Sequence, residues 1–189
     1  MKIQLDFSSI TIENAILKIE ASTIEEDWLE DYLIFLKSYK NQTEFTLKTS
    51  GTTGEKKKIK VLKEQMVFSA SATLQYFNLK PSHKVFLSLS TNYVAGKMMI
   101  VRAIILGLQL DLINPTSRPL EFLNKSYDFV PMVPLQLQNS LDQLHHVKKI
   151  IVGGAKVSLN LRQKLQSKSS VIYETYGMTE TITHIAIKK

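Results

Sequence analysis

The spacing of apolar residues divides the chain into short segments with two different periods. Alternation of polar and apolar residues, typical of half-buried strands, covers 2–7 and 57–62, whereas apolar residues recur at helical spacing over 24–39 and 63–77. Short apolar runs bounded by turn residues follow. The pattern predicts strands over 2–7, 45–47, 57–62, 84–89, 108–113, 128–130, 149–152 and 171–173, and helices over 24–39, 63–77, 98–106, 134–141 and 159–166.

The alternation of these segments predicts an α/β fold. Strand, helix and strand at such lengths form βαβ units, so we expect a mainly parallel twisted sheet flanked by helices. We expect Ser22 or Thr23 to cap the first helix and Gly107 to end the third. The chain divides into a helical and strand lead-in over 1–44 and an α/β core over 45–189.

Composition narrows the class of protein and of partner. With 189 residues, 44% hydrophobic and 22% charged, the chain suits one soluble domain or two small ones. The formal charge of +7 favours anionic partners such as ATP, CoA and acidic metabolites. Nucleic acid fits poorly, because the basic residues are not interleaved with aromatic ones. The sequence leaves the oligomeric state open, a homo-oligomer included.

Cysteine usage and hydropathy indicate the compartment. The absence of cysteine excludes a disulfide framework, a thiolate metal site and a cysteine nucleophile. The N-terminus lacks the continuous apolar core of a signal peptide, and the most apolar region, 98–113, is broken by Arg102, Gly107, Gln109 and Asp111. We therefore expect a cytoplasmic protein without a membrane span.

A loop rich in glycine and hydroxyl groups joins two of the predicted strands. Glycines let backbone N–H groups approach an anion, hydroxyl groups add donors, and a following lysine adds positive charge, so the loop suits phosphate. It is not a Walker A loop, since only two residues separate its glycines. A solvated turn is the alternative. The candidate phosphate-binding residues are Thr49, Ser50, Gly51, Thr52, Thr53, Gly54 and Lys57.

Two later stretches accompany this loop. They are Gly153-Gly154-Ala155 and Tyr173-Glu174-Thr175-Tyr176-Gly177-Met178-Thr179-Glu180-Thr181. Together with the loop they resemble the adenylate-forming superfamily of acyl-CoA synthetases, whose motifs Thr-Ser-Gly-Thr-Thr-Gly-x-Pro-Lys and Tyr-Gly-x-Thr-Glu occur in the same order. Within that superfamily the motif Tyr-Gly-Met-Thr-Glu-Thr is most similar to that of the o-succinylbenzoate–CoA ligases of menaquinone biosynthesis. The resemblance covers about Phe45 to the end of the chain.

The resemblance implies an ATP-dependent, AMP-forming ligase that uses magnesium and takes CoA as co-substrate. A carboxylate attacks the α-phosphate of ATP and releases pyrophosphate, and the CoA thiol then displaces AMP from the acyl-adenylate. The protein mainly positions the reactants and stabilises phosphate charge. The loop would hold the β- and γ-phosphates. Lys56 stands where the family has proline, so Lys56 and Lys57 remain alternatives for the phosphate-binding lysine.

The resemblance also assigns roles to the later motifs. Glu180 would bind magnesium, a hard cation that prefers carboxylate oxygens, and Thr179 would donate to the α-phosphate. Tyr176 would stack on adenine beside Gly177. Gly153, Gly154 and Ala155 would line the adenine and acyl pocket. Without the resemblance, these glycines are read as a turn and Tyr176 as a core aromatic residue.

Weaker substrate candidates are Tyr93 and Arg118. Tyr93 stands where the family commonly has a histidine near the acyl pocket. Arg118 follows Asn114-Pro115-Thr116-Ser117, which is similar to an Asn-Thr-Arg segment of the menaquinone-pathway ligases; it would pair with a substrate carboxylate, or else lie on the surface. His184 is read as a loop histidine.

Family elements beyond the third motif are a ribose-binding aspartate and a C-terminal lid with its lysine. The chain ends at Lys189, so we expect a core fragment or a truncated homologue that lacks the lid and is inactive alone. Three functions stay open: o-succinylbenzoate–CoA ligase, another aryl- or acyl-CoA ligase, and a module that binds ATP or a carboxylate without turnover.

Overall fold

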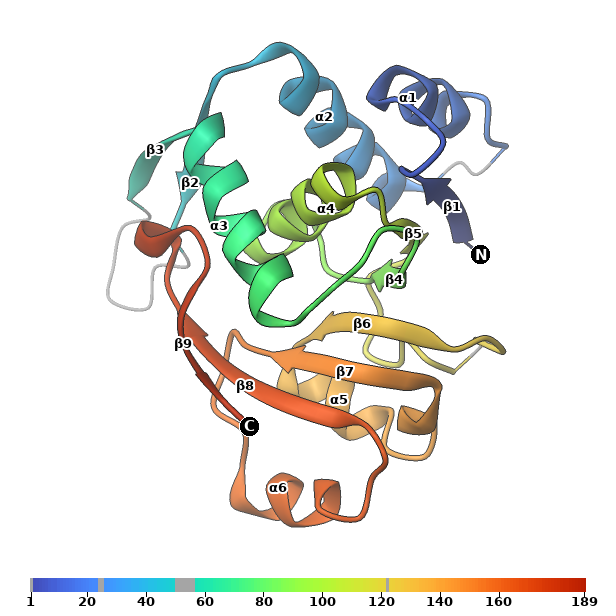
Figure 1. Ribbon diagram of the computed structural model, residues 1–189, viewed down its shortest axis with the longest axis vertical. Coiled ribbons are helices and arrows are strands. Elements are labelled where there is room, and N and C mark those ends of the chain that lie inside the picture. Colours follow the sequence, from blue (N-terminus) through green and yellow to red (C-terminus); the bar gives the residue numbers. More distant parts are fainter. Residues whose placement is uncertain (1, 24–25, 50–56, 122) are drawn as a thin grey trace.

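The chain folds around a sheet of seven strands with helices on both faces (Figure 1). The computed structural model describes residues 2–23, 26–49, 57–121 and 123–189. The strand order is β1-β5-β4-β6-β7-β8-β9; the five inner strands are parallel, and β1 and β9 are antiparallel edges. β2 and β3 form a separate antiparallel pair. The predicted mainly parallel α/β fold is confirmed.

The described elements have the following bounds. The strands are β1 Lys2–Asp6, β2 Glu44–Lys48, β3 Lys58–Leu62, β4 Lys84–Leu87, β5 Gln109–Ile113, β6 Tyr127–Met132, β7 Val147–Val152, β8 Val171–Gly177 and β9 His184–Lys188. The helices are α1 Ile12–Glu20, α2 Asp27–Asn41, α3 Lys63–Tyr76, α4 Val94–Leu106, α5 Pro134–Asn139 and α6 Leu159–Leu165, with short 3-10 turns η1 Leu144–His146 and η2 Thr179–Thr181. Within the described ranges no helix combines the length and apolar character needed to cross a bilayer.

Several predicted boundaries were wrong. α2 begins at Asp27 with Glu26 as its N-cap, so neither Ser22 nor Thr23 caps it. α4 begins at Val94 rather than at Met98, because its first turn lies against the chain after β4. Gly107 does end α4, in the left-handed conformation (φ 67°) that favours glycine.

Two elements went unpredicted because their own signals are weak. α1 has only nine residues, and its capping bond, from the Asn14 N–H to Oγ1 of Thr11, is 3.3 Å long. β9 buries none of its residues fully and pairs only with β8. Short elements of this kind are stabilised by tertiary packing rather than by their own periodicity.

The sheet separates two hydrophobic cores. Val85 and Leu87 of β4 belong to one core, whereas Phe86 between them belongs to the other. Helices α1 to α4 lie on one side of the sheet, and α5 and α6 lie on the opposite side (Figure 1). Residues before 45 belong to the first core as well: the hydroxyl of Tyr32 donates to the carbonyl oxygens of Leu89 and Ile113 at 3.2 and 3.4 Å. The lead-in therefore supports the ends of β4 and β5.

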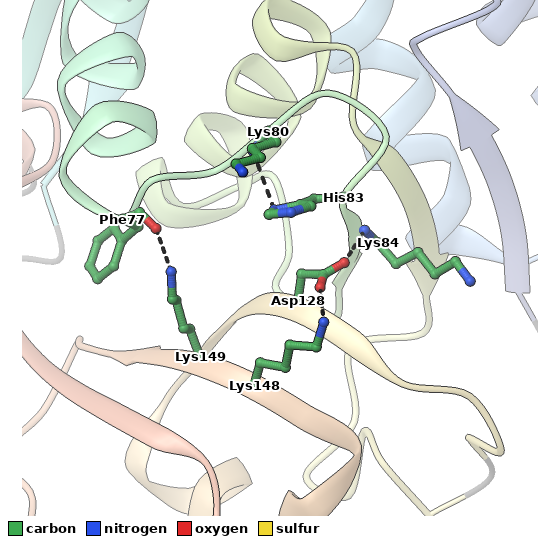
Figure 2. Close-up of polar contacts among 7 residues, drawn as sticks. All are labelled: Phe77, Lys80, His83, Lys84, Asp128, Lys148 and Lys149. Carbon is green, nitrogen blue, oxygen red and sulfur yellow. Dashed lines mark hydrogen bonds and ion pairs between the residues drawn. The ribbon is translucent and has the colours of Figure 1, made fainter.

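Polar contacts tie together the amino-terminal edge of the parallel strands (Figure 2). Asp128 of β6 accepts from the backbone N–H of Lys84 and from Nζ of Lys148, both at 2.8 Å, and so joins β4, β6 and β7. Nζ of Lys149 donates to the carbonyl oxygen of Phe77 at 2.6 Å, which holds the end of α3 to β7. The candidate site lies at the opposite edge of the sheet, where the parallel strands end.

Candidate nucleotide and acid site

The carboxyl ends of β7 and β8 bring two of the predicted motifs together. Oγ1 of Thr175 on β8 donates to the carbonyl oxygen of Val152 at 3.1 Å, and a Cβ at Gly153 would lie 2.9 Å from that same oxygen atom of Thr175. Gly154 has φ 82°, a conformation that L side chains rarely adopt. The glycine pair thus exposes backbone beside the start of the Tyr176 motif. Ligands of open α/β sheets bind at this edge.

β8 continues into that motif as far as Gly177, so its first residues are strand rather than loop. The ring of Tyr176 is 61% exposed, as an aromatic platform for a ligand requires, and it is not the core residue of the alternative reading. A Cβ at Gly177 would collide with the carbonyl oxygen of Thr183 and lie 2.7 Å from Cα of His184. This close approach fixes the turn between β8 and β9.

η2 carries the predicted catalytic residues within that turn. Oγ1 of Thr181 accepts from the N–H of Met178 at 3.0 Å and also bonds back to carbonyl oxygens, which closes the turn. Glu180 lies on its exposed side and forms no ion pair with any described residue; Thr179 is partly buried. Within the described residues no three His, Asp or Glu side chains gather into a metal-binding group. Glu180 is therefore an exposed carboxylate, unpaired among the described residues, on a hydrogen-bonded turn.

A buried arginine supports the same turn from behind. Arg102 on α4 is 2% exposed, and its Nη2 donates to Oγ1 of Thr183 at 2.9 Å and to Oγ1 of Thr73 at 3.4 Å. Its Nε has no hydrogen-bond partner, and it forms no ion pair with a carboxylate among the described residues. Burial lowers the pKa of Arg102 to about 10, so the guanidinium stays charged at neutral pH. A buried cation without an anion is costly.

Arg102 lies behind the wall of a groove of about 770 Å³. The groove runs between α3 and the segment from η2 to β9, and its lining includes Phe68, Thr73, Tyr76, Ile182, Thr183 and His184. Burial, and secondarily the charge of Arg102, lowers the pKa of His184 to about 4, so its ring is neutral at pH 7. The groove is thus mostly apolar, with a positive charge beneath Thr73 and Thr183, and Glu64 in the first turn of α3 is the carboxylate in its lining.

The sequence did not single out Arg102 or the threonines around it. The available signal was a lone arginine within an otherwise apolar helix, Met98 to Leu106. It was read only as an interruption of a hydrophobic stretch. Long-range packing brings Thr183, distant in sequence, to this arginine.

The base of the predicted phosphate loop is a closed hairpin. The N–H of Thr49 donates to the carbonyl oxygen of Lys57 at 3.0 Å, and the N–H of Lys57 donates to Oγ1 of Thr49 at 3.1 Å. These bonds extend the pairing of β2 with β3. The remaining predicted loop residues lie outside the described residues: Ser50, Gly51, Thr52, Thr53, Gly54 and Lys56.

The two weaker candidates lie at the surface. Tyr93 is the N-cap of α4 and is 66% exposed. The side chain of Arg118 is 64% exposed and pairs with Glu121 at 3.7 Å. Arg102, rather than Arg118, is the arginine that the fold encloses.

Comparison with known proteins assigns the chain to a family. The family model described as "AMP-binding enzyme" matches residues 27–189. The chain belongs to the AMP-binding enzyme family. A curated relative in this family, the 2-succinylbenzoate–CoA ligase of Bacillus subtilis (strain 168), is 22% identical over 186 residues, which cover 95% of this chain and 38% of the relative. The chain thus spans less than half of that relative's length.

Solved structures agree with the family assignment. An acyl-CoA synthetase (AMP-forming)/AMP-acid ligase II-like protein from Dyadobacter fermentans has a TM-score of 0.84 and 31% identity, with 100% of this chain and 54% of that chain covered. The o-succinylbenzoate CoA synthetase of Bacillus subtilis, in complex with ATP and magnesium ion, has a TM-score of 0.69 and 16% identity, with 98% and 46% covered. The fold of this AMP-binding chain is therefore that of part of the acyl-CoA synthetases.

Proposed function

We propose that the chain is the nucleotide-binding core of an AMP-forming acid–CoA ligase whose acid is 2-succinylbenzoate. In the reaction, one carboxylate of the acid attacks the α-phosphate of ATP and pyrophosphate leaves. The thiol of CoA then attacks the acyl carbon and AMP leaves. Two observations support the reaction class. The chain belongs to the AMP-binding enzyme family, and the exposed backbone of Gly154, the exposed ring of Tyr176 and the exposed Glu180 follow the ends of β7 and β8.

The choice of acid rests chiefly on one observation, the buried charge of Arg102, which no carboxylate of the described part of the chain pairs with. 2-Succinylbenzoate carries two carboxylates, so one remains negative after the other is adenylated. A carboxylate in the groove, accepting a hydrogen bond from the hydroxyl of Thr183, would offset the charge of Arg102, whose Nη2 donates to that same oxygen, in a place where water screens little. A monocarboxylic acid would leave that charge uncompensated. The curated relative named for this acid supports the same choice.

Glu180 is the residue proposed to hold magnesium. Its exposed carboxylate is not engaged by a described cation, and magnesium keeps most of its waters while taking one or two carboxylates beside phosphates. The ion supplies charge neutralisation for the leaving pyrophosphate. Thr179 offers a hydroxyl donor beside it, Tyr176 an exposed ring for adenine, and Gly153 and Gly154 open backbone.

Titration calorimetry with ATP tests the nucleotide part of the proposal. The 189-residue chain is titrated with ATP in the presence and absence of magnesium, as wild type and as Glu180→Ala, with Glu30→Ala on α2 as a control at another exposed acid. We expect magnesium to strengthen ATP binding. In the presence of magnesium, Glu180→Ala should bind ATP about tenfold more weakly than the wild type does. Identical binding by wild type and Glu180→Ala in both conditions would remove Glu180 from the site.

A further inference from the structure

A second cavity, small and polar, lies between β2 and the first turn of α4. Its volume is about 130 Å³. At roughly 30 Å³ per water molecule, it has room for about four waters or for one tetrahedral anion. Its lining residues are Thr46, Leu47, Lys48, Asn92, Val94 and Lys97.

The charged groups of this cavity are cationic. Lys48 and Lys97 contribute ammonium groups, and no carboxylate is among the described residues that line it. The neighbouring acid is Asp31, whose Oδ2 already accepts from Nδ2 of Asn92 at 2.7 Å and from Oγ of Ser90 at 3.3 Å. Asp31 therefore orients Asn92 at the rim rather than filling the cavity.

Lys97 is held in place before any ligand arrives. Its Nζ donates to the carbonyl oxygen of Thr91 and lies 5.2 Å from the centre of the Phe35 ring. Burial lowers the pKa of Lys97, against a smaller opposing effect of Asp31. An ammonium group fixed in a partly desolvated position binds an anion at little entropic cost.

We propose that this cavity binds a phosphoryl group, supplied either by pyrophosphate or by CoA. Lys48 directly precedes Thr49, so the cavity adjoins the hairpin base of the predicted phosphate loop without including that loop. The phosphoryl oxygens accept from Nζ of Lys48 and Lys97, from Nδ2 of Asn92 and from the hydroxyl of Thr46. The choice of these two compounds rests on the proposed ligase function, whereas the anion site itself rests only on the cavity.

Calorimetric titration distinguishes the two sources. The 189-residue chain is titrated with magnesium-free pyrophosphate and, separately, with CoA at one fixed ionic strength. Lys97→Met puts an unbranched apolar side chain beside Phe35 and removes the charge, Lys48→Met removes the other charge at an exposed position, and Lys164→Met on α6 is the control. We expect roughly tenfold weaker binding of one compound in both cavity variants and no change in the control. The compound affected identifies the source.

Two results would overturn the proposal that the cavity binds a phosphoryl group. Unchanged affinity for both compounds in Lys48→Met, or a wild-type chain that binds neither compound, overturns the proposal even if Lys97→Met fails to fold. If ATP with magnesium does not bind while pyrophosphate or CoA binding still depends on both lysines, the ligase function fails and the anion site stands. Thermal unfolding of each variant, followed by circular dichroism, verifies its fold.

Discussion

Nη2 of Arg102 lies 2.9 Å from Oγ1 of Thr183 and joins the middle of α4 to the turn that follows the Tyr-Gly-Met-Thr-Glu motif. The two residues are far apart in sequence, and the arginine has no anionic partner among the described residues. One contact thus couples a buried charge, the wall of the large groove and the turn that carries Glu180. The arrangement supports the proposal that an anionic substrate binds in this groove.

Arg102→Met should not destabilise the free protein. The substitution removes a desolvated charge and leaves an unbranched apolar side chain in its place, so the cost of burying an unpaired charge disappears. We expect the melting temperature without ligand to stay level or rise. A fall of many degrees would show that Arg102 serves stability rather than substrate binding.

Gly177→Ala should disrupt the turn. The added Cβ would meet backbone atoms of Thr183 and His184, which cannot move aside as a flexible side chain does. We expect a loss of about 1–3 kcal/mol in the free energy of unfolding, measured by urea denaturation. Gly154→Ala is a comparison of a different kind, because there the φ of 82° is strained while the nearest contact is a side-chain atom 3.5 Å away. A fully tolerated Gly177→Ala contradicts the close approach.

His184 should make stability depend on pH. Its pKa is lowered from 6.5 to about 4, chiefly by burial. Between these values the unfolded chain binds a proton that the folded chain does not, so stability falls as the pH falls from 6.5 towards 4. His184→Gln should flatten the melting temperature over this window relative to wild type. Parallel pH profiles for the two proteins would contradict the burial of a neutral imidazole.

Asp128→Asn should weaken the amino-terminal edge of the sheet. Partial burial alone would raise the pKa of Asp128, but hydrogen bonds from Lys148 and from the N–H of Lys84 outweigh it and lower the pKa. The carboxylate therefore stabilises the fold above pH 3.8, and this contribution is lost as the pH falls through the lowered value. We expect a loss of about 1–2 kcal/mol at pH 7 by urea denaturation. Lys148→Met should reproduce only part of it, because the Lys84 bond remains.

The fold could be predicted where one element buries a regular pattern. The strands around Val85, Val130 and Ile150 contain short apolar runs because both faces of the parallel sheet are covered. The edges could not be predicted in this way. β9 is half exposed and exists because β8 offers it an unpaired edge, and the pairing of β1 with β5 joins opposite ends of a long sequence interval.

The candidate site divides in the same manner. Gly153, Tyr176 and Glu180 belong to compact motifs, so their chemistry can be read locally, and the structure brings Gly153 and the start of the Tyr176 motif to one edge. The roles proposed for Arg102 and Lys97 could not be predicted, because they depend on the burial of these side chains in the fold. In the sequence each is an ordinary basic residue on one helix. Only the fold shows that Arg102 is buried behind the large groove and that Lys97 lines the small cavity.

The most direct test of the proposed function compares two hydrolysis-resistant adenylates, one of 2-succinylbenzoate and one of benzoate, by titration calorimetry with wild type and Arg102→Met. We predict that the wild-type chain binds the 2-succinylbenzoyl adenylate at least about tenfold more tightly, because its free carboxylate neutralises Arg102, and that Arg102→Met loses this preference. Equal affinities in the wild type, or a preference that persists in Arg102→Met, would contradict the proposal.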